Sequence, residues 1–231
     1  MSIPFARSAA AAMMLGAATL RGQAGDSSYS LVVGRLTRHY VLHRPRASQS
    51  RGGALPLVVL LHGRGGSGLL MQRKTEFNAI ADSVGALVAY PDGFRRSWND
   101  GRPGTPANMS NVDDVAFISA MLDDIARRAP VDPRRVYVAG HSNGGFMAER
   151  LACQMPGRFA AVGVVSATFG EWLAGSCHPA VAVSLEYFNG TKDPLVPFDG
   201  GRMGDRGVAQ GARATVARWV GWNRCTGAGE S

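Results

Sequence analysis

The sequence predicts one α/β domain built on a mainly parallel sheet with helices on both faces. Apolar runs typical of strands alternate along the chain with segments that have the period of a helix. Some of these runs are apolar without interruption, as expected for strands that are covered on both faces. The candidate strands are residues 29–33, 38–42, 55–61, 86–90, 136–139, 161–165 and 181–188. The candidate helices are residues 69–83, 112–128, 143–155 and 208–223.

Each element has local support in the sequence. Residues 29–33 and 38–42 alternate apolar and polar side chains, which predicts two half-buried antiparallel strands at the start of the domain. Residues 55–61 are continuously apolar, which predicts a central strand. The helix at residues 112–128 repeats its apolar side chains at helical spacing, and Asn111 is the candidate for its N-cap.

The composition indicates one globular domain and argues against nucleic-acid binding. A chain of 231 residues suits a single hydrophobic core. The formal charge is +8, and nearly all of the positive charge is arginine, because lysine occurs only at Lys74 and Lys192. These arginines form no basic run interleaved with aromatic residues. We therefore interpret them as solvated surface residues and expect no nucleic-acid partner.

The N-terminus has the pattern of a secretory signal peptide over residues 1–24. Arg7 precedes a run of small and apolar residues, and Gly22, Gln23 and Ala24 fit a small-x-small cleavage site. This run is too short for a stable membrane span, and no later stretch is apolar for long enough to cross a bilayer. We expect an exported protein, extracellular or periplasmic, whose domain occupies residues 29–231.

Export gives the three cysteines a structural meaning. In an oxidising compartment, an odd number of cysteines leaves one thiol unpaired. Cys153 and Cys177 flank the candidate strand at residues 161–165 and are candidates for a disulfide. Cys225 would then be the unpaired cysteine.

The candidate nucleophile is Ser142, in a G-x-S-x-G motif that spans residues 140–144. A strand is predicted directly before the motif and a helix directly after it, which is the context of a nucleophile elbow. Gly140 and Gly144 lack the side chains that would collide as strand and helix close on each other. The backbone N–H of Asn143, immediately after the nucleophile, is the first candidate donor to an oxyanion.

A second oxyanion donor and an acid are expected from two other loops. The glycine-rich loop at residues 62–66 follows a central strand, and Arg64 is our choice for its donor, with Gly65 as the alternative. Asp193 lies in a loop after a late strand and fits the order Ser, Asp, His. Asp199 and Asp205 are weaker candidates, and the alternative role for Asp193 is to stabilise its own turn.

Five segments together resemble the secreted polyhydroxybutyrate depolymerase and feruloyl esterase-like α/β-hydrolases, a lineage that includes acetyl xylan esterases. The segments are residues 62–66, 90–93 with 98–99, 113–118, 140–145 and 190–197. The resemblance implies an α/β-hydrolase fold and carboxylic-ester hydrolysis, with Ser142 as nucleophile and Asp193 as the triad acid. It also implies that Trp98 and Asn99 lie near the substrate cleft, with a packing role as the alternative for Trp98.

No histidine stands where the resemblance places the catalytic base, which is after the acid in a Gly-His-x-Trp-Pro-like segment. All five histidines precede Asp193: His39, His43, His62, His141 and His178. We expect His62 to brace the oxyanion loop and the His141 side chain to point into the structure, which leaves His178 as the best substitute. The resemblance thus predicts a C-terminally truncated domain that lacks its last strand and helix and is weakly active or inactive. A divergent enzyme with another base is the alternative.

The predicted function is carboxylic-ester hydrolysis through an acyl-enzyme at Ser142. The resemblance implies feruloyl or acetyl esters of polysaccharide, or polyhydroxyalkanoate polyester, as substrates. The alternatives are an inactive relative that binds such substrates and a serine peptidase of the same fold. We expect no cofactor and no metal.

Overall fold

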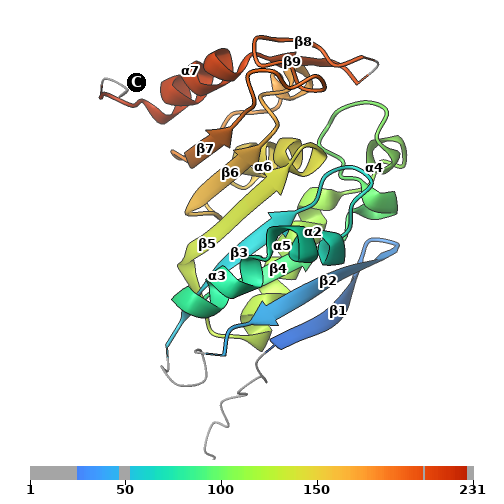
Figure 1. Ribbon diagram of the computed structural model, residues 1–231, viewed down its shortest axis with the longest axis vertical. Helices are drawn as coiled ribbons and strands as arrows, with labels where there is room; N and C mark the ends of the chain where they lie inside the picture. The colour runs from blue at the N-terminus through green and yellow to red at the C-terminus, as the bar shows by residue number, and fades with distance from the viewer. Residues whose placement is uncertain (1–24, 47–52, 205, 228–231) are drawn as a thin grey trace, which may run out of the picture.

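The computed structural model describes residues 25–46, 53–204 and 206–227, so the predicted signal peptide lies outside the described residues. The strands of the main sheet are β1 (Gly25–Val33), β2 (Leu36–Arg44), β3 (Leu55–Leu61), β4 (Leu87–Pro91), β5 (Val131–His141), β6 (Ala161–Val165) and β7 (Ser184–Phe188). They lie in the order β1-β2-β4-β3-β5-β6-β7 (Figure 1). The five strands from β4 to β7 in this order are parallel, and β1 and β2 are antiparallel additions. The predicted mainly parallel sheet is confirmed.

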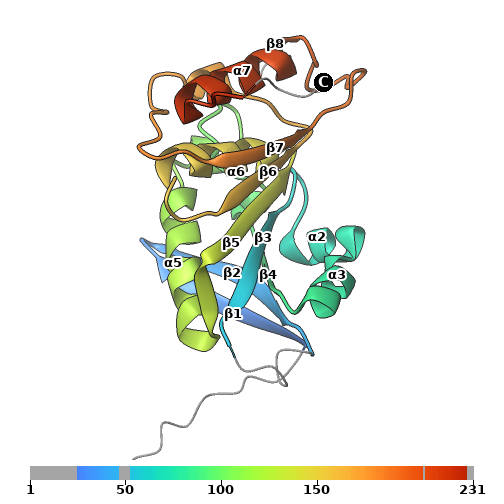
Figure 2. The same ribbon diagram turned by 90° about the vertical axis from the view of Figure 1, so that its left-hand side faces the viewer.

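Helices cover both faces of this sheet, as predicted. The helices are α2 (Gly68–Thr75), α3 (Phe77–Val84), α4 (Pro106–Met109), α5 (Asp114–Arg128), α6 (Asn143–Gln154) and α7 (Ala212–Asn223). Figure 2 shows α2 and α3 on one side of the sheet and α5 on the other. A separate hairpin of β8 (Gly200–Arg202) and β9 (Val208–Gln210) precedes α7.

The side chains of the central strand β3 alternate between two hydrophobic cores, one on each face of the sheet. Leu57, Val59 and Leu61 pack in the larger core with residues of α5 and α6. Val58 and Leu60, the residues between them, contact the smaller core formed with α2 and α3. Successive side chains of a strand point to opposite faces, so a continuous apolar run is what a strand between two helical layers requires.

Several strand limits shift by a few residues, and three further differences from the sequence prediction change an element or its cap. The helix predicted at residues 69–83 is divided into α2 and α3 at Glu76, which has the left-handed φ of 49° and donates its N–H to the Gln72 carbonyl. The N-cap of α5 is Asp113, whose Oδ1 accepts from the Ala116 N–H at 2.9 Å, so Asn111 was the wrong choice. Residues 208–210, predicted as helix, form β9 instead.

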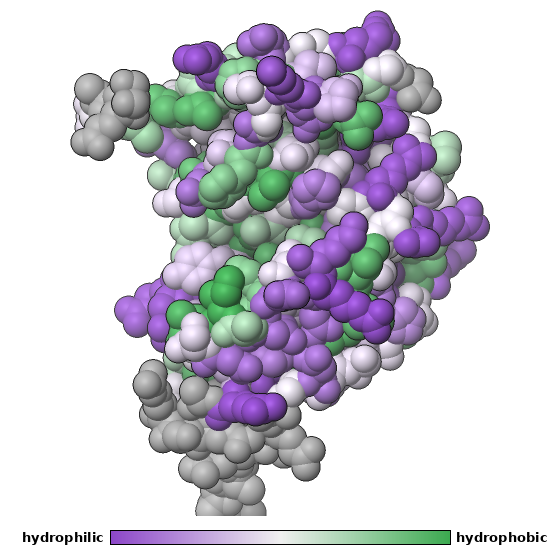
Figure 3. All heavy atoms as spheres, in the orientation of Figure 1, coloured by the Kyte–Doolittle hydropathy of each residue, from purple (hydrophilic) through white to green (hydrophobic). Residues whose placement is uncertain are grey.

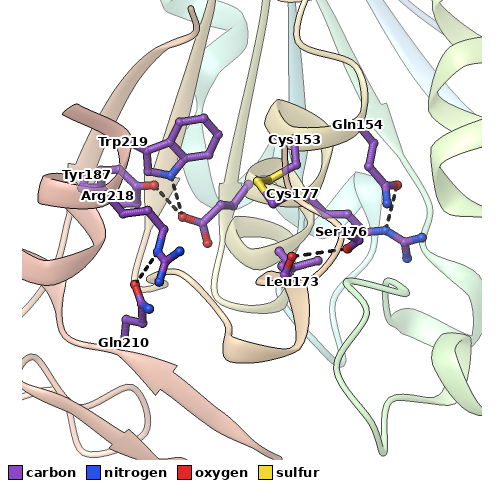
Figure 4. Close-up of a disulfide and its surroundings, with 11 residues drawn as sticks. Cys153, Gln154, Leu173, Ser176, Cys177, Tyr187, Gln210, Arg218 and Trp219 are labelled. Atoms are coloured by element: carbon purple, nitrogen blue, oxygen red, sulfur yellow. Dashed lines mark hydrogen bonds between the residues drawn. A yellow bond between two sulfur atoms is a disulfide. The ribbon is translucent and has the colours of Figure 1, made fainter. Parts of the chain in front are cut away.

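A disulfide joins Cys153 at the end of α6 to Cys177, with a Cα–Cα distance of 4.9 Å (Figure 4). It links α6, the helix that follows Ser142, to the segment between β6 and β7. In the same region, Tyr187 and Trp219 donate to one carboxylate oxygen of Glu149, which is fully buried on α6. Cys225 is exposed and free.

The outer edge of β7 is the open end of the sheet, because no further strand pairs with it among the described residues. A groove of about 640 Å³ runs between β7 and α7, with Leu185, Val216 and Cys225 in its lining. The space-filling view shows a hollow with hydrophobic residues on the left-hand side of the molecule, below α7 (Figure 3). In the part of the chain that the structure describes, no helix combines the length and apolar character needed to cross a membrane.

Candidate active site

Ser142 lies at a sharp turn between β5 and α6. Its φ of 54° and ψ of −118° are unusual for a residue with a side chain, and such strain persists only where the surroundings enforce it. The turn is held on both sides, because the Ser142 N–H donates to the Val165 carbonyl at 2.8 Å and the Ser142 carbonyl accepts from Phe146 at 3.0 Å. Although Ser142 is the N-cap residue of α6, its side chain does not cap the helix. The hydroxyl is therefore left available in a half-buried position.

The two motif glycines allow strand and helix to approach closely. A Cβ placed on Gly140 would lie 2.0 Å from the Gly144 carbonyl oxygen. A Cβ placed on Gly144 would lie 2.3 Å from the Leu61 carbonyl oxygen, in the neighbouring strand β3. No side chain fits at either position, so the backbone geometry matches the elbow that the motif predicts.

Two backbone N–H groups beside Ser142 lack acceptors within the described chain. The Asn143 N–H belongs to the first residue of α6, which has no helical acceptor. In the loop at residues 62–66, Gly65 donates to the Arg96 carbonyl at 2.7 Å, whereas Arg64 has no acceptor. A Cβ on Gly63 would lie 3.5 Å from Ser142 Cβ, so this loop lies against the nucleophile. These contacts favour Arg64 over Gly65 as the second donor.

Asp193 lies in the loop after β7, at the same end of the sheet. Its Oδ1 accepts from the backbone N–H groups of Leu195 at 2.8 Å and Val196 at 3.0 Å. This oxygen thus stabilises the turn, which was the alternative role considered for Asp193. Its Oδ2 has no partner among the described residues and can accept a further donor. Asp199 is exposed, and Asp205 lies outside the described residues.

One strand separates the nucleophile from this acid. Ser142 follows β5, Asp193 follows β7, and β6 lies between them. Backbone hydrogen bonds connect the ends of these three strands. The Ser142 N–H donates to the Val165 carbonyl at the end of β6, and the Ser166 N–H donates to the Phe188 carbonyl at the end of β7, both at 2.8 Å. Neighbouring strands are about 4.8 Å apart, so the two loops start roughly 10 Å from each other. A spacing of this size leaves room for a third group between the hydroxyl and the carboxylate.

The histidines do not fill this space, because none is hydrogen-bonded to Ser142 or Asp193 in the described chain. His62 uses both nitrogens, since Nδ1 is 2.8 Å from the Gly63 carbonyl oxygen and Nε2 accepts from the Gly93 N–H at 2.9 Å. Burial lowers the pKa of His62, which fits this neutral bracing role. His43 is held by two aspartates, Asp26 and Asp82.

The other three histidines are exposed: His39, His141 and His178. The expectation for His141 was wrong, because its side chain is exposed beside Gly63 and does not point into the structure.

Trp98 and Asn99 are placed differently from the expectation that they face a substrate cleft. Trp98 is fully buried, and its Nε1 donates to the His62 carbonyl at 2.8 Å. Asn99 is also buried, and its Nδ2 donates to the Val112 carbonyl at 2.8 Å. The side chains support the loops behind the site, so a direct contact with substrate does not fit their burial. Asp100, which the sequence did not single out, is fully buried next to them.

Comparison with known proteins shows the family to which the chain belongs. The family model for esterase PHB depolymerases matches residues 39–199, and the chain belongs to this family. "Putative esterase NocK" of Nocardia uniformis subsp. tsuyamanensis is 36% identical over 77% of the chain and 51% of its own length. Feruloyl esterase B of Piromyces equi is 32% identical over 75% of the chain and 33% of its own length.

Solved structures support the fold. The crystal structure of a thermostable esterase matches 86% of the chain and 52% of its own length, with a TM-score of 0.64 at 18% sequence identity. The α/β-hydrolase fold predicted from the motifs is thereby confirmed. The chain spans about half the length of NocK and a third of feruloyl esterase B.

Proposed function

We propose that the protein is a serine ester hydrolase with Ser142 as its nucleophile. The observation that carries this proposal is the strained backbone of Ser142, whose hydroxyl does not cap α6, while the adjacent Asn143 N–H has no acceptor among the described residues. Strain of this kind is maintained at functional sites. Membership of the esterase family supports the same reaction class.

The reaction follows from the placement of these groups. Ser142 Oγ attacks the ester carbonyl carbon, and the electron pair of the C=O bond moves to the carbonyl oxygen. The N–H groups of Asn143 and Arg64 stabilise this oxyanion. Collapse of the tetrahedral intermediate expels the alcohol and leaves an acyl-enzyme, which water hydrolyses to the free acid and Ser142.

Acylation needs two proton transfers, from the hydroxyl of Ser142 to a base and from that base to the leaving alcohol, and deacylation needs two more, from water to the base and from the base to Ser142 Oγ. Asp193 Oδ2 is positioned at the same end of the sheet to orient such a base. Because no histidine among the described residues is hydrogen-bonded to Ser142, we expect these residues alone to give turnover that is slow compared with an enzyme that has a complete triad.

The proposed substrates are feruloyl or acetyl esters of polysaccharide, or hydroxyalkanoate polyester. Feruloyl esterase B among the relatives supports the first of these. The test is a panel of methyl ferulate, acetylated xylan and hydroxybutyrate oligomers, each assayed with the wild-type protein and with Ser142→Ala. Hydrolysis that disappears in Ser142→Ala supports the proposal. Equal hydrolysis by both proteins, or none on any ester, contradicts it.

We also propose that the protein acts outside the cytoplasm. The signal-peptide pattern at residues 1–24 supports export, and the Cys153–Cys177 disulfide suits an oxidising compartment. Expression of the full gene, followed by cell fractionation and a non-reducing gel, tests this. Export predicts a shortened, oxidised protein in the periplasm or medium, whereas a full-length, reduced cytoplasmic protein contradicts it.

A further inference from the structure

The residues at 98–100 contact both halves of the candidate oxyanion hole. On the nucleophile side, the Trp98 N–H donates to Asn143 Oδ1 at 2.8 Å, and Asn143 Nδ2 donates to the Trp98 carbonyl at 3.1 Å. On the other side, Trp98 Nε1 donates to the His62 carbonyl at 2.8 Å, at the start of the loop that carries Arg64. A single buried residue therefore links the two donors.

The carboxylate of Asp100 also contacts the Asn143 side chain. Asn143 Nδ2 also donates to Asp100 Oδ2 at 2.7 Å, and both side chains are fully buried. The three hydrogen bonds of the Asn143 side chain are thus all made to residues 98 and 100. Hydrogen bonds to an ionised group are shorter and about twice as strong as neutral ones. The Asn143 side chain is therefore held by three hydrogen bonds.

Asp100 is itself anchored from the far side. Arg102 Nη2 lies 2.9 Å from Asp100 Oδ2, and the Arg102 backbone N–H donates to Oδ1 at 3.0 Å. The Arg102 guanidinium lies over the rings of Phe146 at 4.8 Å and Trp172 at 5.8 Å. Trp172 Nε1 in turn donates to the Asp100 carbonyl at 2.9 Å. Burial raises the pKa of Asp100, and the charge of Arg102 opposes this increase.

We propose that Asp100 is a positioning residue for the oxyanion hole, acting through the Asn143 side chain to fix the direction of the Asn143 backbone N–H. The inference rests on the proposed function, because it assigns that N–H to the developing oxyanion. An oxyanion donor works through its preorganised direction, and outright loss of one donor lowers kcat by about 10² to 10³. Loss of its alignment should have a smaller effect, of about ten- to hundredfold.

A buried carboxylate can also stabilise a fold without a role at the site, so a matched control is needed. Asp114 provides one, because it too is fully buried, pairs with Arg38 at 2.6 Å and accepts from the Asn99 N–H at 2.7 Å. It supports the same segment at Asn99, and no hydrogen bond joins it to Asn143 among the described residues. Asp114→Asn should therefore reduce stability without lowering kcat.

The kinetic experiment compares Asp100→Asn and Asp114→Asn with p-nitrophenyl acetate as substrate, together with their melting temperatures. We expect Asp100→Asn to lower kcat about ten- to hundredfold with KM changed less than threefold. We expect Asp114→Asn to keep kcat within threefold at a similar loss of melting temperature. Equal losses of kcat in the two variants would overturn the proposal.

A double-mutant cycle tests whether the effect passes through the Asn143 side chain. Asn143→Ala keeps the backbone N–H but removes the link to Asp100. In the Asn143→Ala background, Asp100→Asn should change kcat less than twofold. A full second loss would show that Asp100 acts by another route and would overturn the proposal.

A readout without turnover separates this inference from the proposed function. In ¹H–¹⁵N NMR spectra, Asp100→Asn should shift the Asn143 backbone amide resonance, whereas Asp114→Asn should leave it in place. If Asp100→Asn does not fold, Arg102→Lys, which weakens the anchor of Asp100, should shift the same resonance. An unchanged Asn143 resonance overturns the inference even in an active enzyme. Absence of ester turnover with a shifted resonance counts against the proposed function alone.

Discussion

Gly140 and Gly144 contact each other across the nucleophile turn so closely that a Cβ on Gly140 would lie 2.0 Å from the Gly144 carbonyl oxygen. The obstacle is backbone, which cannot rotate away as a side chain can. The strained conformation of Ser142 between them depends on this approach, because the last residues of β5 must turn directly into α6. The two glycines therefore permit the backbone conformation that Ser142 adopts at this turn.

Gly140→Ala should displace the elbow. The added methyl group would overlap with the backbone of Gly144, which cannot move without displacing α6. We therefore expect a loss of at least about 2 kcal/mol in the free energy of unfolding and loss of esterase activity. Urea denaturation measures the first effect and ester hydrolysis the second. Gly157→Ala is the control, because a Cβ there meets nothing within 4 Å. A stable, active Gly140→Ala protein contradicts the close approach.

The buried Glu149 should make stability depend on pH. Burial raises its pKa to about 7 from an ordinary value of 4.5, although Tyr187, Trp219 and Arg218 oppose this increase. Between these two values only the folded protein holds the proton, so folding binds a proton and stability falls as the pH rises. A shift of this size corresponds to about 3 kcal/mol. The free energy of unfolding should therefore be highest near pH 4.5 and should fall until about pH 7.

The control for this prediction is a pair of isosteric substitutions. Glu149→Gln keeps an oxygen that can accept from Tyr187 and Trp219 but cannot ionise, so it should remove most of the decline between pH 5 and pH 8. Glu186→Gln, on the exposed face of β7, should leave the decline intact. Urea denaturation across this pH range measures both. A decline of equal size in Glu149→Gln excludes Glu149 as its source.

The Cys153–Cys177 disulfide should stabilise the region behind the nucleophile helix. The two cysteines are separated by 24 positions in the sequence, and closing a loop of this size contributes about 3 kcal/mol through the entropy of the unfolded chain. The double substitution Cys153→Ala with Cys177→Ala should lower the free energy of unfolding by about this amount, measured by urea denaturation. Cys225→Ser should have no effect, because this thiol is free and exposed. Equal stability of the three proteins would contradict the structural role.

Asp193 should show two separable contributions from its two oxygens. Asp193→Asn keeps Oδ1, which accepts from the Leu195 and Val196 N–H groups, and should change stability by less than about 0.5 kcal/mol. Asp193→Ala leaves both N–H groups without this acceptor and should cost about 1–2 kcal/mol. Asp199→Ala is the exposed control. Equal stability of Asp193→Ala and the wild-type protein would show that the turn does not need this side chain.

Imidazole added to the solution should accelerate ester hydrolysis by the wild-type protein. In the proposed reaction Ser142, the two oxyanion donors and Asp193 supply every group except the base, and a diffusible base can then accept the proton of Ser142. Methyl ferulate is a suitable substrate, because imidazole alone reacts slowly with an unactivated ester. The rate should rise with imidazole concentration in the wild-type protein and stay at the background level in Ser142→Ala. No acceleration in the wild-type protein argues against an accessible, activatable Ser142.

Local patterns were sufficient to predict much of the fold. β3 occupies the predicted residues 55–61, because a short uninterrupted apolar run is typical of a strand that is covered by helices on both faces. The break at Glu76 was missed, because glutamate is a good helix former and only its left-handed φ divides the helix. The cap of α5 was assigned two residues early, because Asn111 and Asp113 are both good capping residues.

The site was less predictable where distant parts of the chain meet. The elbow follows from neighbouring residues, and its glycines and serine are where the motif places them. The burial of Trp98 depends on Asn143, which is 45 positions away in the sequence, so residues 98 and 99 could not be recognised as supports. The same distance concealed Asp100, since a buried aspartate in a polar, glycine-rich loop has no local signature.

The most direct test of the account is covalent labelling of Ser142 by a fluorophosphonate, read by intact mass and by peptide mapping of the folded protein. The account predicts one adduct per chain, located on Ser142 and absent from Ser142→Ala. It also predicts slower labelling in Asp100→Asn, because the Asn143 N–H stabilises the phosphonyl oxygen as it would an oxyanion. A folded protein that takes up no label, or one in which the label persists in Ser142→Ala, would contradict the assignment of Ser142 as the nucleophile.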